Sequence, residues 1–138
     1  MRRGFTLIEL LVVIAILGFS TVVGLRWFKS LSRIKLRETV SSFKAFIRYA
    51  QFLSLESSTE AEVIIDAGCE IKVLIAGGVL KFRKPKDVLC LVEKNLNTTE
   101  NATVVVSGWY IEPVKFRFFM RKEEDMYREV DLSKLSLW

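Results

Sequence analysis

Histidine is absent from this 138-residue sequence, and cysteine and proline occur only twice each. Without histidine the chain has neither an imidazole general base nor a His-ligated metal site. Its two cysteines form no CxxC pair, and the sequence contains no glycine-rich phosphate loop and no nucleophile motif. We therefore predict a protein that is not an enzyme and that needs no cofactor and no metal.

Positive charge is unevenly distributed along a chain whose net charge is +5. Residues 26–58 carry seven basic and two acidic side chains, whereas residues 59–138 carry twelve basic and thirteen acidic ones. A nucleic-acid-binding domain needs a positive face that displaces counterions from phosphates. The nearly balanced charge of residues 59–138 therefore argues against a nucleic-acid binder.

One long apolar run dominates the beginning of the chain. After a short basic start and Gly4, the twenty-one residues 5–25 contain a single charge, Glu9. At about 1.5 Å per residue, an α-helix of this length crosses the hydrocarbon core of a bilayer. A charge at the centre of such a span costs about 2.5 kcal/mol or more, so we expect Glu9 to have a function and a partner.

The run GFTLIELLVVIAIL resembles the class III signal of type IV pilins and of the pseudopilins of type II secretion systems. Glycine, phenylalanine, a hydroxyl residue and glutamate fall at the spacing of that family. The resemblance implies that a prepilin peptidase cuts between Gly4 and Phe5 and methylates the new amino terminus of Phe5. It also implies that Glu9 serves assembly with other pilin or pseudopilin subunits. The alternatives are a signal anchor that is never cut and a cleaved secretory peptide, whose apolar core would be shorter.

Cleavage would leave a cationic amine on Phe5 in apolar surroundings, where it needs an anion. Glu9 of the same chain lies one helical turn away, and Glu9 of a neighbouring subunit would serve equally well. A buried ion pair of this kind is better evidence for a specified register between subunits than for stability. The alternative is that Glu9 extends to the membrane interface.

Two signals disagree about orientation. Five basic residues soon after the apolar run outnumber the positive charges before it, and the positive-inside rule would place the remainder of the chain in the cytoplasm. The peptidase motif requires the opposite orientation and is more specific. We therefore expect a single-pass protein of the bacterial inner membrane, with its head outside the cytoplasm, that later joins a pilus or pseudopilus.

The apolar pattern continues past the membrane run. Residues Leu36, Val40, Phe43, Ile47 and Ala50 repeat at intervals of four, three, four and three. This spacing predicts an amphipathic helix. The simplest interpretation is one helix from about residue 5 to residue 55 or 56, whose second half packs on the sheet that follows.

From residue 62 onward the pattern changes to that of β-strands. We predict strands at residues 62–66, 69–75, 79–83, 88–92, 102–107, 114–120 and 127–132. Gly77-Gly78 is predicted to form a hairpin turn. Residues 95–101 and Glu123-Glu124-Asp125 are predicted to be solvated loops, the latter in preference to a calcium site. We expect Trp109, Tyr110 and Trp138 to pack in the core or at an edge.

The two cysteines allow two states. A disulfide between Cys69 and Cys90 would suit a compartment outside the cytoplasm and would add about 3 kcal/mol of stability. Two buried free thiols are the alternative.

These observations predict an α+β, pilin-like fold: a long amino-terminal helix packed on a small β-rich head. We divide the chain into a leader at 1–4, a transmembrane half of the helix at 5–25, an amphipathic half at 26–58 and a globular head at 59–138. The stalk and strand pattern is similar to minor subunits of the GspH/FimT type. Members of that type that bind DNA carry an arginine-containing motif near the chain end, which residues 131–138 lack.

The sequence thus favours a minor pilin-like structural subunit of a type II secretion pseudopilus or a type IV pilus. Its expected partners are prepilin peptidase, other subunits and the inner membrane. The alternative is a DNA-binding minor pilin of a DNA-uptake system.

Overall fold

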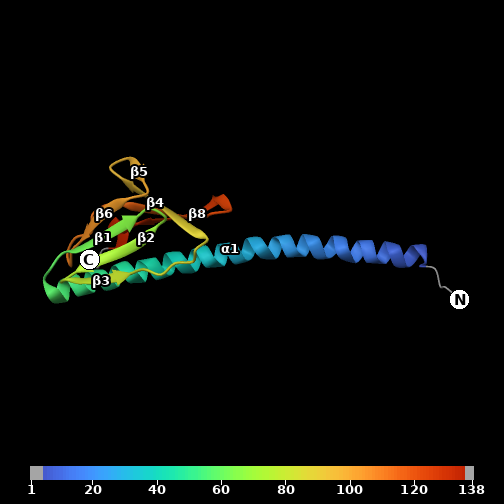
Figure 1. Ribbon diagram of the computed structural model, residues 1–138, viewed down its shortest axis with the longest axis horizontal. Helices are drawn as coiled ribbons and strands as arrows, with labels where there is room; N and C mark the ends of the chain where they lie inside the picture. The colour runs from blue at the N-terminus through green and yellow to red at the C-terminus, as the bar shows by residue number, and fades with distance from the viewer. Residues whose placement is uncertain (1–4, 136–138) are drawn as a thin grey trace. The chain divides into compact units, whose positions relative to one another are not determined.

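The computed structural model describes residues 5–135 (Figure 1). A single helix, α1 (Leu7–Ser57), is followed by eight strands and a short 3₁₀ helix, η1 (Leu132–Leu135). The chain divides into two compact units, the first ending at Ile34 and the second beginning at Lys35. This is the predicted α+β arrangement of one long apolar helix and a head of antiparallel strands.

The first unit is the amino-terminal part of α1. Its side chains are almost all exposed, although most of them are apolar. This part of the helix is long and apolar enough to cross a membrane, and none of its apolar window is buried. The helix begins at Leu7 because Thr6 caps it, two residues later than the sequence predicts.

The second unit contains two antiparallel sheets of four strands each. Their orders are β3-β2-β1-β6 and β5-β4-β7-β8. The strands are β1 (Ala61–Asp66), β2 (Glu70–Ile75), β3 (Gly78–Lys81), β4 (Val88–Lys94), β5 (Asn97–Thr99), β6 (Ala102–Val106), β7 (Lys115–Met120) and β8 (Glu123–Asp131). All seven predicted strands are confirmed, with shifted ends.

Three local predictions were wrong. The hairpin between β2 and β3 turns at Ala76 and Gly77, which have φ angles of 46° and 79°, so Gly78 already belongs to β3. Both central residues of a type I′ turn need positive φ. Residues 95–101, predicted to be a loop, include the strand β5. It pairs with β4 in a second hairpin of this kind, with Asn95 and Leu96 at the turn. Glu123-Glu124-Asp125 open β8, because a register shift at Phe119/Met120 extends the β7–β8 hairpin.

The core of the second unit lies where the helix meets the sheets. One helix face is buried, and its members are Leu36, Thr39, Phe43, Ile47, Ala50, Gln51 and Ser54. The ring of Phe43 lies 4.7 Å from that of Phe116, 5.0 Å from that of Phe118 and 5.7 Å from that of Phe82. The predicted docking of the amphipathic stripe is therefore confirmed, with Phe43 at its centre.

A disulfide links the two sheets of the head. Cys69 precedes β2 and Cys90 lies in β4, and their Cα atoms are 5.4 Å apart. Of the two states that the sequence allows, the structure has the bonded one. The bond closes a loop across 21 positions of sequence, for which loop-closure entropy gives about 3 kcal/mol of stabilisation.

We predict that replacing Phe43 by Ala destabilises a soluble fragment of residues 30–138 by about 3–5 kcal/mol, because the ring is fully buried among three others. The matched control is Phe52→Ala, since Phe52 lies on the same helix but is 57% exposed. That control should change stability by no more than about 0.5 kcal/mol. Urea unfolding followed by circular dichroism measures both, and equal effects would contradict the packing.

Candidate functional site

The first turn of α1 holds the glutamate that the sequence singles out. The Glu9 Oε2 accepts hydrogen bonds from the Thr6 backbone N–H at 2.9 Å and from the Thr6 hydroxyl at 3.0 Å. The backbone N–H of Glu9 donates to the Thr6 hydroxyl oxygen at 3.3 Å. This reciprocal pattern is a capping box, in which two amide groups that the helix leaves unpaired find acceptors.

Thr6 is the functional residue that the sequence analysis did not single out. Its role was readable from Thr6-Leu7-Ile8-Glu9, because a hydroxyl residue followed three positions later by glutamate is the signature of a capping box. The capping box uses only one carboxylate oxygen. Within residues 5–135, no hydrogen-bond donor reaches the other, Glu9 Oε1. Gly4, on the far side of the expected cleavage, lies outside the described residues.

Polar side chains further along this unit are satisfied by the helix itself. The Ser20 hydroxyl donates to the Ile16 carbonyl at 2.8 Å, and the Thr21 hydroxyl donates to the Gly18 carbonyl at 2.8 Å. In hydrocarbon such internal bonds remove the penalty of a lone hydroxyl. No atom of the chain lies within 4 Å of a Cβ placed on Gly18 or Gly24, so both glycines leave open space on the helix. Glu9 is the one charged side chain among residues 5–25.

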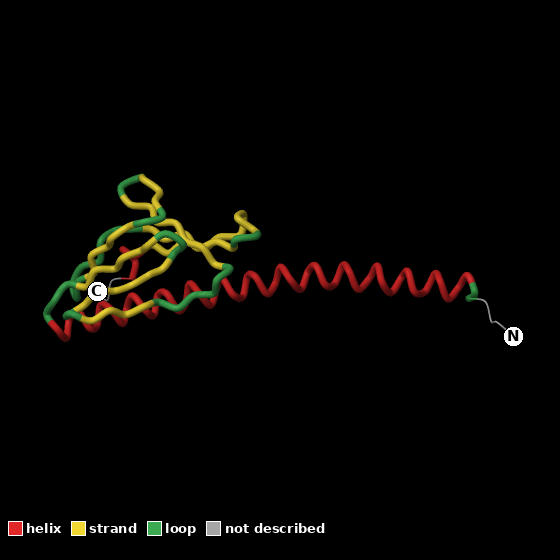
Figure 2. Tube along the Cα trace, viewed as in Figure 1, coloured by secondary structure: helices red, strands yellow, loops and turns green. Residues whose placement is uncertain are grey.

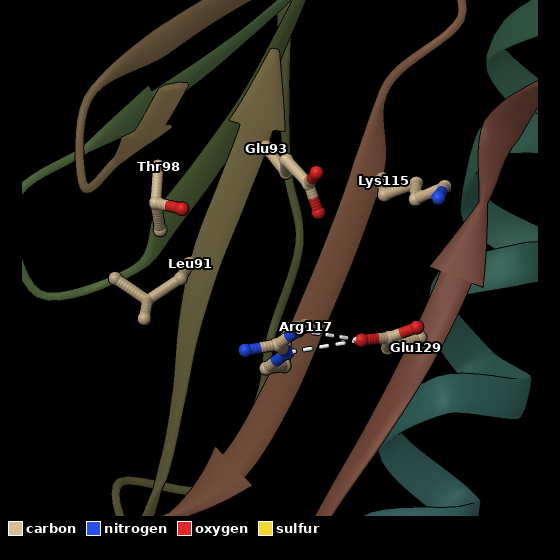
Figure 3. A pocket seen from close by; sticks show the side chains of 6 residues that line it. All are labelled: Leu91, Glu93, Thr98, Lys115, Arg117 and Glu129. Atoms are coloured by element: carbon tan, nitrogen blue, oxygen red, sulfur yellow. Dashed lines mark hydrogen bonds and ion pairs between the residues drawn. The ribbon is translucent and has the colours of Figure 1, made fainter. Parts of the chain in front are cut away.

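The exposed face of the second sheet carries ion pairs. Arg117 of β7 donates to the Glu129 carboxylate of β8 at 3.1 and 2.7 Å (Figure 3). The guanidinium of Arg117 also lies 4.9 Å from the centre of the Tyr127 ring. The bond to Glu129 raises the pKa of Arg117 above its usual value. Arg117 is thus already neutralised within its own head.

A tight turn presents two aromatic side chains to solvent. The Ser107 N–H donates to the Tyr110 carbonyl at 2.7 Å, and the Tyr110 N–H donates to the Ser107 hydroxyl at 3.0 Å. Trp109 is 73% exposed and Tyr110 is 56% exposed. Packing in the core, one half of the prediction, was therefore wrong for both side chains, and packing at an edge stays a prediction. Trp138 lies outside the described residues.

The turn rests on the helix through Gly108. The buried Gln51 side chain donates to the Gly108 carbonyl at 3.4 Å. A Cβ added at Gly108 would overlap the side chain of Leu55. Glycine is needed here because the turn approaches the helix so closely.

Acidic side chains do not gather into a metal site in the described part of the chain. Within residues 5–135, no group of three or more His, Cys, Asp or Glu side chains could hold a metal ion. Glu123-Glu124-Asp125 are strand residues rather than a ligand loop.

Comparison with known proteins agrees with the geometry of the first turn. Residues 1–25 match the family model of the prokaryotic N-terminal methylation motif. No curated protein and no solved structure gives a significant match to the chain. The matched motif and the long apolar helix support a type IV pilin-like class. In that class, prepilin peptidase processes the amino terminus and subunits assemble with one another.

We predict that Gly108→Ala destabilises the second unit by about 1–3 kcal/mol, because the added methyl overlaps Leu55. The control is Gly78→Ala, whose added Cβ would lie 3.5 Å from the Ile75 carbonyl oxygen, an ordinary contact. In a Leu55→Ala background, Gly108→Ala should lower the free energy of unfolding by less than it does in the wild type, because the overlapping side chain is then absent. Equal melting temperatures for the wild type and Gly108→Ala would contradict the close approach.

Proposed function

We propose that this protein is a minor structural subunit of a type IV pilus or of a type II secretion pseudopilus. Cleavage between Gly4 and Phe5 starts its assembly. The observation that carries the proposal is the first unit itself, an exposed apolar helix with its sole carboxylate, Glu9, in its first turn. One oxygen of that carboxylate receives no hydrogen bond from any of residues 5–135.

Cleavage changes the electrostatics of this turn. It creates a positive amine on Phe5, two residues before the helix start at Leu7. The amino-terminal end of a helix already carries a partial positive charge, so an added cation there is unfavourable. In apolar surroundings the amine gains most by contacting a carboxylate, and Glu9 is the only one in residues 5–25.

The capping box favours an amine from a neighbouring chain over the amine of the same chain. Glu9 Oε2 is held by Thr6 of its own chain, which fixes the orientation of the carboxylate. Glu9 Oε1 remains available to the Phe5 amine of a neighbouring subunit. A pair formed between chains sets the axial register of one subunit on the next, and a buried ion pair is well suited to that task.

The remainder of the first unit supports the same account. Its exposed apolar side chains need lipid around them before assembly and other helices afterwards. Gly18 and Gly24 leave open space at which a second helix can approach closely, as small residues do in membranes. We propose that residues 5–25 span the inner membrane and then form the filament core, while residues 59–138 face outward.

We predict that the mature protein begins at Phe5 and that its amine carries a methyl group. Mass spectrometry of the protein from its native membrane measures both. Replacing Gly4 by Val should leave the chain uncut, whereas Gly18→Val, a change within the helix, should leave cleavage unaffected. A wild-type protein that begins at Met1 would contradict this prediction.

We predict that Glu9→Ala and Glu9→Gln leave insertion and cleavage intact but lower incorporation into filaments about tenfold or more, which corresponds to about 1.4 kcal/mol or more of lost contact. Glutamine keeps an acceptor for Thr6 but removes the charge, so it isolates the ion pair from the capping box. Quantitative immunoblots of sheared filaments measure incorporation.

The matched controls alter the cap. Thr6→Ser retains the hydroxyl and should assemble normally. Thr6→Val removes the hydroxyl but retains the charge of Glu9, so it should lower incorporation less than Glu9→Gln does. Wild-type incorporation of Glu9→Gln would exclude the role of the charge.

A further inference from the structure

Half of the basic side chains of residues 59–138 line one groove of the head, of about 610 Å³. It lies beside the segment 82–87, which connects β3 to β4. We call it the basic groove. Its cationic residues are Lys72, Lys81, Arg83, Lys84, Lys86 and Arg121. The near-neutral total charge of residues 59–138 thus conceals a strongly positive site.

Most of these cations lack an acidic partner. Lys72 is neutralised by Asp66 at 2.7 Å and Glu70 at 3.5 Å. Within residues 5–135, no ion pair involves Lys81, Arg83, Lys84, Lys86 or Arg121. Lys84 donates to the Val88 carbonyl at 2.6 Å, and its burial together with the charge of Arg121 lowers its pKa. The groove therefore holds uncompensated positive charge.

The groove is held in shape by backbone hydrogen bonds. The Phe82 N–H donates to the Ile71 carbonyl at 2.9 Å, and the Arg121 N–H donates to the Asp87 carbonyl at 2.8 Å. Lys35 of α1 forms an ion pair with Asp87 at 3.7 Å. A basic loop that is only solvated does not need these hydrogen bonds. A binding site benefits from them, because a segment that is already ordered loses less conformational entropy on binding.

A complementary surface lies on the same head, and we call it the acidic end. It consists of Glu56 in the last turn of α1 and of Glu60 and Glu62 at the start of β1, all exposed. None of the three forms an ion pair with any other described residue. The last turn of α1 contains no basic residue, so the negative end of the helix dipole adds to these charges.

The two surfaces lie at opposite ends of the head. Glu60 immediately precedes β1 and Glu62 is its second residue. Lys72 pairs with Ile64, and its ammonium group contacts Asp66, the last residue of β1. Along α1, Lys35 and Glu56 are separated by about 32 Å at 1.5 Å per residue. Figure 2 shows the α1–β1 loop and the segment after β3 at opposite ends of the sheet.

We propose that the acidic end of one head binds in the basic groove of a second copy of this chain. The inference rests on the proposed function and names the partner of the head in the filament. Because the two surfaces differ, the contact is heterologous: one copy supplies the acidic end and the other supplies the basic groove. The same chain supplies both charges, which favours a second copy over an unrelated anion.

Cross-linking of the full-length chain in detergent tests the contact. Equal amounts of ¹⁴N- and ¹⁵N-labelled protein are mixed and treated with a carbodiimide, which joins lysine amines to carboxylates in direct contact. The expected products are mixed-isotope peptides that join Lys81, Lys84 or Lys86 to Glu56, Glu60 or Glu62. Products between Lys72 and Asp66 should carry one isotope only and serve as the internal control. Yields should fall steeply between about 0.05 M and about 1 M salt.

Charge reversal provides the matched variants. Arg83→Glu with Lys86→Glu should lower the mixed-isotope yield about tenfold, because like charges then face each other. Lys44→Glu with Lys122→Glu changes the net charge equally, outside the basic groove, and should have no effect. Adding Glu56→Lys, Glu60→Lys and Glu62→Lys to the first pair should restore mixed-isotope products, now through the new lysines and glutamates.

Three outcomes would overturn the proposal: mixed-isotope peptides that avoid the acidic end, yields insensitive to the groove variant, or a full reversal that restores nothing. Salt-dependent binding of duplex DNA that the groove variant abolishes, without mixed-isotope products, would assign the groove to nucleic acid instead. The proposed function fails separately, through an amino terminus other than Phe5. Equal melting temperatures for the variants and the wild type verify that they are folded.

Discussion

A single carboxylate in an apolar helix constrains this molecule more than any other group. Glu9 cannot lie unpaired in hydrocarbon without a large penalty, and among residues 5–135 its own chain provides only the two donors of Thr6. Those bonds fix its direction and leave Glu9 Oε1 without a donor among residues 5–135. Under the proposed function, proteolysis supplies the missing cation by converting the amide nitrogen of Phe5 into an amine. On this account, cleavage makes the assembly contact as well as removing the leader.

The distribution of apolar side chains along α1 changes between its two parts. Up to Ile34 its apolar side chains are exposed, and they suit lipid or other helices. From Lys35 onward its apolar side chains form a narrow stripe that is buried against the sheets. The Phe43 ring in this stripe contacts the rings of Phe116 and Phe118. The disulfide between Cys69 and Cys90 joins these sheets. Under the proposed function, these contacts let the second unit keep its shape while the first unit exchanges lipid for protein neighbours.

The sequence predicted what depends on local periodicity. The buried stripe around Phe43 and seven strands follow from spacings of three, four and two residues, and the structure confirms them. The exact positions of the hairpin turns could not be predicted. The one-residue shift at Gly77 and the register shift at Met120 depend on how the strands pair, which local periodicity does not determine. The basic groove could not be predicted for a different reason. The charges of residues 59–138 nearly cancel when they are summed along the sequence, whereas the fold brings basic side chains together in the groove. Thr6 was readable and was overlooked.

The central claim is that Glu9 pairs with the Phe5 amine of a neighbouring chain. Solid-state NMR measures this pairing directly on filaments assembled from this chain alone, in which every neighbour is another copy. Chains with ¹⁵N at the Phe5 amine are mixed equally with chains carrying ¹³C at the Glu9 carboxylate, and dipolar dephasing of the carboxylate is recorded. The account predicts dephasing in the mixed filaments, which only contacts between chains can produce. Dephasing restricted to filaments of doubly labelled chains diluted in unlabelled protein would show pairing within one chain and would contradict it.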